Sequence, residues 1–465
     1  MDLLAGLSGI LPEDRIHTGD EEPDRHGRAF FAYHEPHAPD AVVYPGNRDE
    51  VVQVLRFANE RGVPVVPYGQ GSSLEGHTIP KRGGISLDTG LMVEILGVRP
   101  RDFVARVQPG VTHGRLDERL KENGLFFPVD PGRDASIGGM AATNASGTNA
   151  VRYGAMRDQV PGLEVVLADG SAMRTGGMAT KWSAGYNLTG LFVGSEGTLG
   201  VFTEVILRLY PIPEHVLAAR VAFPDVEAAG RAAVATIRSG MRVGRVELVD
   251  ARTVEAVNAY KGTDYAVSPT LFPEFSGSEA SVEEDVEKAR TISGLEGSEA
   301  FEFEGDEAER ERLWEARHEA GIATKELHPG AKPMTTDVCV PASGLPGALR
   351  HARDTIASYG LDGAILGHVG DGNYHAVFPV YPGDEEDLRR AEEVNAEIVD
   401  YALARGGTST GEHGVGSGKT KHLGKEHGDS LPFMRELKRL ADPKGILNPG
   451  KIFSDEGREA REGSY

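Results

Sequence analysis

The sequence predicts an α+β protein with two parts, a glycine-rich α/β unit followed by a domain in which an antiparallel sheet is covered by helices. Two observations support this division. Short apolar strands and an amphipathic helix alternate with three glycine-rich turns up to residue 211. After Pro211-Ile212-Pro213, extended runs alternate with amphipathic helical patterns. A chain of 465 residues is long enough for two or three domains with sizeable cores.

The first glycine-rich turn follows a strand, a helix and a second strand. Pro39–Tyr44 is a predicted strand, and Asp49–Arg61 has the apolar spacing of a helix that Gly62 ends. Val63–Pro67 is extended again and leads into Tyr68–His77, which is rich in Gly and Ser. Such a run lets backbone N–H groups turn toward an anion, as in a phosphate-binding nest.

Two further glycine-rich turns follow. Ser136–Asn149 has too little side-chain bulk to pack a core, so it indicates close approach of another surface, such as a flat cofactor. A flexible loop is the alternative. The third turn, Phe192–Gly200, lies between predicted strands at Leu163–Leu167 and Val201–Leu209.

The second half has the pattern of a sheet with helices. Strands are predicted at Val216–Phe223, Leu271–Phe275 and Phe301–Phe303, and helices at Val226–Arg238 and Ala280–Gly294. The acidic residues of the last helix are typical of a solvated face.

Two histidines flank a predicted hairpin turn in this half. Asp371-Gly372 is typical of a type I′ turn, which would place His368 directly opposite His375. Opposed side chains lie about 5 Å apart at Cβ, so both imidazoles could hold one cation. Glu412 is the third candidate ligand, and two His with one carboxylate suit Zn²⁺ or Mn²⁺ with positions left open for substrate. An exposed turn is the alternative.

Composition limits the function classes. The net charge of −22 argues against binding to nucleic acid or anionic membrane. Cys339 is the only cysteine, which excludes an internal disulfide, a thiolate zinc site and an iron–sulfur cluster held by this chain alone. The sequence contains no apolar run of about 20 residues, so it predicts no membrane-spanning helix. The first 19 residues resemble neither a secretory signal nor a transit peptide. We expect a cytoplasmic protein, or one peripheral at the inner membrane face.

The three turns, in this order, resemble the PCMH-type FAD-binding domain of the vanillyl-alcohol-oxidase-type family. The resemblance to its D-lactate dehydrogenase (cytochrome) and glycolate oxidase catalytic-subunit branch covers nearly the whole chain. The motifs that carry it are Gly71–His77, Pro131-Gly132, Ile137–Gly139, Asn144–Gly147, Arg152–Gly154 and Gly194–Gly200. It implies a two-subdomain FAD-binding domain over residues 1–211, a substrate-binding cap over 212–425, and a C-terminal segment, 426–465, that returns to the FAD domain.

The resemblance also implies which residues hold FAD. Gly69–Ser73 would bind the pyrophosphate through backbone amides, while Ser136–Gly147 and Val201 would lie along the flavin and adenosine portions. The expected cofactor residues are Gly69, Gln70, Gly71, Ser72, Ser73, Pro131, Ser136, Gly138, Gly139, Ala142, Asn144, Ser146, Gly147, Gly154, Glu196, Gly197, Val201 and Asn448. His77 is a conceivable covalent attachment point, although this branch generally binds FAD without a covalent bond.

In the same branch, an Arg after Trp-x-x and a Lys fifteen residues later bind the substrate carboxylate. Arg317 and Lys332 occupy those positions, and a bidentate Arg beside a point-charge Lys suits this task. Gly321 and Val377 replace a Thr and an Asn found in relatives that oxidise 2-hydroxyglutarate. These departures argue against a second substrate carboxylate.

The predicted function is FAD-dependent oxidation of a small D-2-hydroxy acid, with D-lactate to pyruvate the best single choice. A metal on His368, His375 and Glu412 would lower the pKa of the hydroxyl. His413 would take its proton while the Cα hydrogen passes as hydride to flavin N5. An external cytochrome, quinone or electron-transfer flavoprotein would accept the electrons. A homodimer is one option for the oligomeric state.

Four alternatives remain at this point. A glycolate oxidase catalytic subunit would use the same residues. A D-2-hydroxyglutarate dehydrogenase is the second alternative. A non-redox flavin enzyme, like the alkyl-glycerone-phosphate synthases, would bind FAD but keep it oxidised. A flavin-free metallohydrolase would be colourless.

Overall fold

The computed structural model describes residues 3–454 except 20, 30–32, 131, 133, 305, 307–309, 311–312, 315–316 and 318. The chain divides into two compact units. The first unit combines the residues up to 146, residues 154–211 and the residues from 412 onward. The second unit consists of Gly147–Tyr153 and Ile212–Gly411. The sequence-based division placed the end of the cap after residue 425. In the structure, Glu412 and His413 lie in the first unit.

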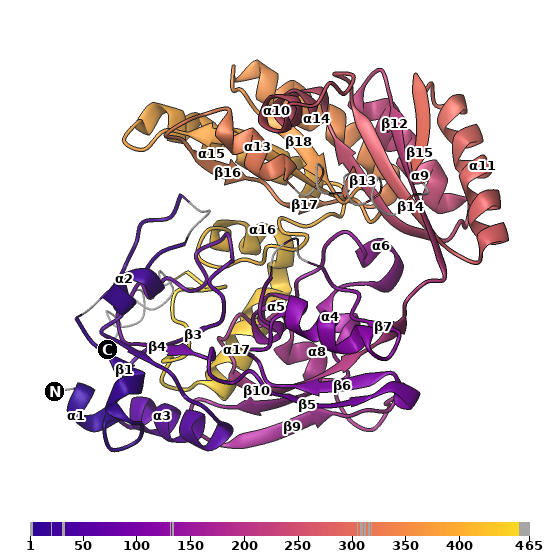
Figure 1. Ribbon diagram of the computed structural model, residues 1–465. Coiled ribbons are helices and arrows are strands. Elements are labelled where there is room, and N and C mark those ends of the chain that lie inside the picture. The colour runs from indigo at the N-terminus through magenta and orange to yellow at the C-terminus, as the bar shows by residue number, and fades with distance from the viewer. Residues whose placement is uncertain are drawn as a thin grey trace. The chain divides into compact units, whose positions relative to one another are not determined.

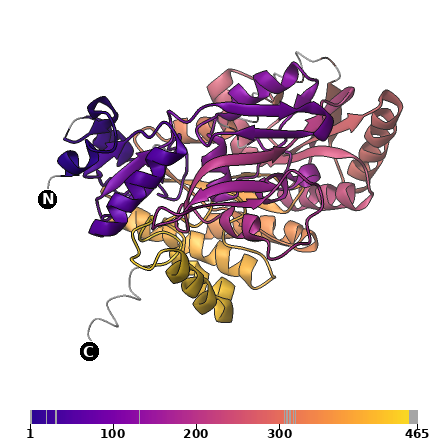
Figure 2. The same ribbon diagram turned by 90° about the horizontal axis from the view of Figure 1, so that it is seen from below.

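Two main sheets form the first unit (Figure 1). The smaller one has the order β1 (Ile16–His17), β2 (Ala41–Val43), β4 (Ile85–Asp88) and β3 (Val65–Tyr68). The strands β2, β4 and β3 are parallel, and β1 is antiparallel to β2. The larger, antiparallel sheet has the order β5 (Ile95–Arg99), β6 (Val104–Val107), β10 (Val201–Arg208), β8 (Gly162–Val166) and β9 (Ala172–Gly176). Figure 2 shows these five strands side by side. A two-stranded pair joins β7 (Leu125–Phe126) to β11 (Tyr210–Pro211).

Helices complete the first unit. They are α1 (Leu3–Leu7), α2 (Glu21–His26), α3 (Arg48–Arg61), α4 (His113–Lys121), α5 (Ile137–Thr143), α7 (Met156–Gln159), α8 (Leu188–Phe192), α16 (Leu423–His427) and α17 (Leu431–Ala441). The prediction of α3 is confirmed. Asn47 caps its first turn by accepting the Glu50 N–H, and Gly62 ends it at a φ of 67°.

The second unit is built on one antiparallel sheet (Figure 1). Its order is β15 (Ala300–Glu304), β12 (His215–Ala222), β14 (Thr270–Gly277), β13 (Val243–Val249), β18 (Ala364–Gly367), β19 (Asn373–Val380) and β16 (Lys332–Thr335), with β17 (Val338–Cys339) also paired to β19. Its helices are α6 (Ala150–Tyr153), α9 (Val226–Arg238), α10 (Ala251–Lys261), α11 (Glu279–Leu295), α13 (Ala320–Glu326), α14 (Leu345–Ser358) and α15 (Glu385–Leu403).

Strand register sets which side chains share a face of this sheet. Glu247 on β13 is opposite Phe272 on β14, and Leu366 on β18 is opposite His375 on β19. Phe272 and Leu366 belong to one apolar cluster with residues of α10 and α13. Because opposed residues in a ladder point to the same side, Glu247 and His375 point to the side of that cluster.

The predicted two-residue turn at Asp371-Gly372 is wrong. His375 is opposite Leu366, not His368, and five residues connect β18 to β19. Only Gly372 of the two turn residues has a positive φ, 90°, whereas a type I′ turn needs both. Tertiary contacts hold the longer loop, since Gly370 N–H donates to the Val246 carbonyl at 3.1 Å.

None of the described helices combines the length and apolar composition needed to cross a membrane.

Candidate functional site

The first two glycine-rich turns meet in the first unit. A Cβ on Gly69, directly after β3, would lie 2.3 Å from the hydroxyl of Ser136, the residue before α5. Gly71 has a φ of 64°, and a Cβ there would lie 2.1 Å from the hydroxyl of Tyr68. Gly69 therefore packs closely against Ser136 of the second turn, while Gly71 packs against Tyr68 of its own turn in a left-handed conformation that favours glycine.

Buried hydroxyl groups gather at the three turns. The Oγ atoms of Ser73, Ser136 and Ser195 are buried and have no hydrogen-bond partner among the described residues. Buried polar atoms are almost always paired in native proteins, so these three are candidates for contact with a polar ligand. Together with the glycine-lined backbone, they fit a dinucleotide such as FAD.

Glu196 organises the third turn. It is 5% exposed, has a φ of 53°, and its carboxylate accepts the N–H groups of Val415 at 2.6 Å and Gly416 at 2.8 Å. His77 Nε2 lies 3.3 Å from the same carboxylate. Burial raises the pKa of Glu196, but His77 and the two N–H groups outweigh it and hold the pKa below its usual value.

Asn448 connects the last segment to these turns. Its Nδ2 donates to the carbonyl of His77 at 3.2 Å and to that of Glu196 at 2.7 Å. Its Oδ1 is buried without a hydrogen-bond partner among the described residues. Nearby, the buried Lys451 Nζ donates to the Ile79 carbonyl at 2.7 Å. The C-terminal segment therefore closes the first unit around the glycine turns.

Four of the predicted cofactor glycines allow the backbone to pack closely or to adopt a left-handed conformation. They are Gly138, which packs on Pro109; Gly139, which packs on Ser136; Gly154, with a φ of 80°; and Gly197, with a φ of 69°, which packs on Pro67. Each allows a close approach or a left-handed conformation that another residue would resist.

Three other predicted cofactor residues belong to the first two glycine-rich turns. The Ala142 carbonyl accepts the Glu196 N–H at 2.8 Å. The Asn144 side chain accepts the Arg157 N–H at 2.9 Å and ends α5 at a φ of 53°. Gln70 is exposed. Ala142 and Asn144 therefore act in the framework of the turns.

Other predicted cofactor residues differ in their surroundings. The Val201 side chain is 2% exposed and packs in the hydrophobic core, so only its backbone could contact a cofactor. Gly147 belongs to the second unit. Ser72 is half-buried beside Ser73. Pro131 lies outside the described residues.

In the second unit, the two candidate metal-ligating histidines are neighbours. The ring centroids of His368 and His375 are 5.5 Å apart. A shift of register by two residues keeps side chains on their original face, which explains why the rings meet although the turn was predicted wrongly. His368 Nδ1 lies 2.9 Å from both carboxylate oxygens of Glu247. His375 Nδ1 lies 3.2 Å from the Thr336 carbonyl and 3.6 Å from Asp337 Oδ1.

These contacts assign the ring nitrogens. In both imidazoles Nδ1 faces an oxygen acceptor, so Nε2 is the nitrogen that would coordinate a cation. The donor set of His368 and His375 therefore fits a divalent metal.

Arg317 is buried in the same unit. Its Nη2 lies 2.6 Å from Glu247 Oε2, and the two residues are 6% and 0% exposed. Sequence reasoning missed Glu247 and Asp337. The alternation of charged Arg245 and Glu247 within an apolar strand was the available signal for Glu247, but only the register identifies its partners.

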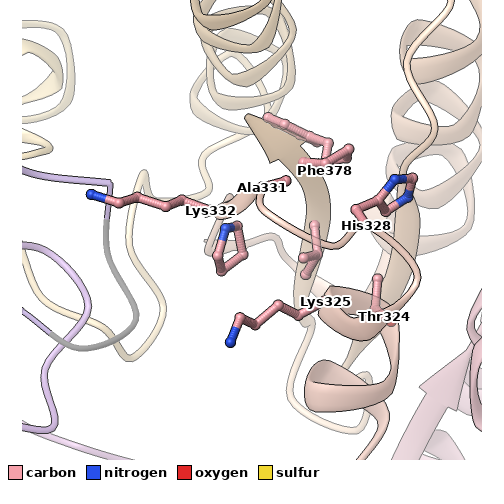
Figure 3. A pocket seen from close by; sticks show the side chains of 9 residues that line it. Thr324, Lys325, His328, Ala331, Lys332 and Phe378 are labelled. Atoms are coloured by element: carbon pink, nitrogen blue, oxygen red, sulfur yellow. The ribbon is translucent and has the colours of Figure 1, made fainter. Parts of the chain in front are cut away.

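Lys332 is exposed on β16, unlike the buried Arg317. It lines an open pocket with residues that include Lys325, His328 and Phe378. Figure 3 shows Lys325 and Lys332 extending to one side of the view and His328 on the other. Two lysine side chains line this pocket, and their positive charge suits an anionic ligand.

Glu412 and His413 begin the last segment of the first unit. His413 Nε2 lies 3.5 Å from Glu412 Oε1, and Ser146 Oγ donates to Glu412 Oε2 at 3.2 Å. Gly411, the preceding residue, belongs to the second unit, where its N–H donates to the Asp337 carbonyl at 2.8 Å. Each unit thus holds part of the predicted ligand set.

Comparisons with known proteins agree with this description. The family model for FAD linked oxidases, C-terminal domain, matches residues 212–452, and that for an FAD binding domain matches residues 39–176. A probable mitochondrial D-lactate dehydrogenase of Danio rerio is 41% identical, covering 97% of this chain and 91% of that protein. A mitochondrial D-lactate dehydrogenase (cytochrome) of Arabidopsis thaliana is 43% identical, covering 97% and 80%.

A bacterial relative and a solved structure extend the comparison. Glycolate oxidase subunit GlcD of Bacillus subtilis is 37% identical and covers 90% of each chain. The crystal structure of p-cresol methylhydroxylase is similar with a TM-score of 0.82, at 19% identity, covering 98% of this chain and 96% of that one. At this identity the structural likeness concerns the fold.

Proposed function

Because the chain belongs to the FAD-linked oxidases, together with D-lactate dehydrogenases and a glycolate oxidase subunit, we propose that it oxidises a small D-2-hydroxy acid. D-lactate, giving pyruvate, is the favoured substrate. The protein is an FAD-dependent oxidoreductase. The observation that carries the substrate proposal is 41–43% identity to two D-lactate dehydrogenases over 97% of this chain.

FAD supplies the acceptor for the Cα hydrogen and the electron pair of the hydroxy acid. The residues proposed to hold it are those of the three glycine turns and Asn448. Gly69–Ser73 would offer backbone N–H groups to the pyrophosphate, and the buried hydroxyls of Ser136 and Ser195 would donate to the cofactor. The polar atoms without protein partners support this assignment.

Arg317, Lys332 and His413 are proposed to act on the substrate. Arg317 would bind its carboxylate through the planar guanidinium, and Lys332 would add a second positive charge. His413 would take the hydroxyl proton at a ring nitrogen, which suits an imidazole because its ordinary pKa lies near neutrality.

A divalent cation, Zn²⁺ or Mn²⁺, is the proposed second cofactor, and it would supply positive charge to the substrate hydroxyl. His368 and His375 are its proposed ligands, since both present Nε2 while Nδ1 faces an oxygen. Glu412 as third ligand stays a prediction from the sequence.

The electron acceptor is proposed to be external. The Arabidopsis relative is named as a D-lactate dehydrogenase (cytochrome), and a cytochrome is therefore the first acceptor to test. A quinone and an electron-transfer flavoprotein are the alternatives.

An anaerobic visible spectrum tests the substrate proposal. We expect D-lactate to bleach the oxidised-flavin band of the purified protein, with L-lactate, glycolate and D-2-hydroxyglutarate as separate comparisons. Stronger bleaching by glycolate would assign a glycolate oxidase subunit instead. A yellow protein that no hydroxy acid bleaches would contradict the substrate proposal while leaving the cofactor in place.

A further inference from the structure

Glu247 joins two side chains to which the proposed function gives different tasks. It lies on β13 and is fully buried. One carboxylate oxygen lies 2.6 Å from Arg317 Nη2, and both lie 2.9 Å from His368 Nδ1. A buried carboxylate is costly unless it is paired and hydrogen-bonded. This geometry meets that condition with the proposed substrate-binding arginine and one proposed metal ligand.

The contact with His368 determines which ring nitrogen carries the proton. A carboxylate is only an acceptor, so Nδ1 must be the donor. In the neutral imidazole, Nε2 then has the lone pair that a cation needs. Without an acceptor at Nδ1, the ring could place its proton on Nε2, and coordination would be lost.

The contact with Arg317 determines the orientation of the guanidinium. Nη2 is held by Glu247, while the buried Nε has no hydrogen-bond partner among the described residues. A guanidinium has five N–H donors in a fixed plane. Fixing one of them therefore aims the others, and a substrate carboxylate can be bound in one orientation.

We infer that Glu247 is a positioning residue that holds His368 in its cation-binding tautomer and Arg317 in its carboxylate-binding orientation. The inference deepens the proposed function and rests on it, because both tasks belong to the hydroxy-acid site. One buried carboxylate would then couple the two ends of the substrate, its carboxylate and its hydroxyl.

The test is Glu247→Gln in the full-length flavoprotein. The amide replaces one carboxylate oxygen by an NH₂ group. Because both oxygens lie 2.9 Å from His368 Nδ1, that NH₂ group faces the ring N–H in either orientation of the amide. We expect Mn²⁺, titrated by calorimetry, to bind about 10–100-fold more weakly. We also expect the KM for D-lactate to rise while the flavin content stays unchanged.

Glu274→Gln is the matched control. Glu274 is also a buried glutamate of this sheet, on the adjacent strand β14, and its Oε1 lies 3.6 Å from Arg245 Nε. It contacts neither His368 nor Arg317. We expect wild-type Mn²⁺ affinity and KM in this variant, although its thermal stability can fall.

Folded Glu247→Gln with wild-type Mn²⁺ affinity and KM would overturn the inference, as would wild-type protein that binds neither Mn²⁺ nor Zn²⁺. If Glu247→Gln does not fold, Glu247→Asp decides. Its shorter side chain keeps the charge but cannot reach both partners, so wild-type values there would overturn the inference too. The proposed function fails separately, when no hydroxy acid reduces the wild-type flavin, and the Mn²⁺ titration still tests Glu247.

Discussion

At the scale of single residues, Asp250 couples the stability of the second unit to pH. It caps α10 by accepting the N–H and hydroxyl of Thr253 at 2.8 and 2.7 Å. Burial raises the pKa of Asp250 to about 6, although the bonds to Thr253 oppose this. An unfolded aspartate titrates near 3.9. The neutral form is therefore favoured in the folded state, and its stabilising contribution, complete below about pH 4, is lost as pH rises through about 6.

Asp250→Asn should remove this pH dependence. Asparagine caps a helix about as well as aspartate and has no charge to desolvate. We expect the variant to be more stable than wild type at pH 8, by on the order of 2 kcal/mol, and the advantage to disappear near pH 4. Urea unfolding at both pH values measures this. Asp225→Asn, the equivalent cap of α9, is the matched control. An equal difference at both pH values would contradict the prediction.

Contacts between residues far apart in the sequence were the least predictable feature of the site. Arg317, His368 and His375 were identified from sequence motifs, but Glu247 was not. A glutamate in an apolar strand has no distinctive pattern, and its two partners lie 70 and 121 positions away. Only the pairing of β13 with β14 and β18 places it.

At the scale of elements, the first glycine turn depends on positive φ at Gly71. An alanine there would pay roughly 1–2 kcal/mol for the left-handed conformation and would collide with the hydroxyl of Tyr68. We expect Gly71→Ala to purify with less than half the flavin of wild type, as the ratio of flavin to protein absorbance reports. Gly124→Ala is the matched control, because Gly124 has a φ of 65° but open space around it. Equal flavin content in the two variants would show that the collision is unimportant.

The helices and strands themselves were largely predictable. The bounds of α9 were predicted as observed, and α3 begins one residue earlier than predicted, because their caps and apolar spacing are local in sequence. The turn between β18 and β19 was not predictable. Its loop is held by the Val246 carbonyl and by close packing of Gly372 on Val340, both far along the chain.

At the scale of the whole molecule, the first unit is assembled from three separate segments. Lys451 ties the last of these to the first, since its buried Nζ donates to the Ile79 carbonyl. Lys451→Met would leave that carbonyl unsatisfied, at a cost of about 1–3 kcal/mol. We expect calorimetry to show earlier unfolding of the flavin-containing unit, accompanied by flavin release.

Lys444→Met provides the comparison for Lys451→Met. Lys444 also donates to a main-chain carbonyl, that of Asn59, but its bond is exposed to water. Its loss should therefore shift the transition little. If both variants unfold at the wild-type temperature, the C-terminal tie does not limit the stability of the unit.

The discontinuous first unit has a consequence for biosynthesis. A ribosome releases the chain in order, so the whole sequence from Ile212 to Gly411 emerges before Asn448 and Lys451 can reach the glycine turns. A nascent chain that stalls before Glu412 carries the turns but lacks their closing segment. The first unit can therefore be completed only after the segment from Glu412 to Lys451 has been synthesised.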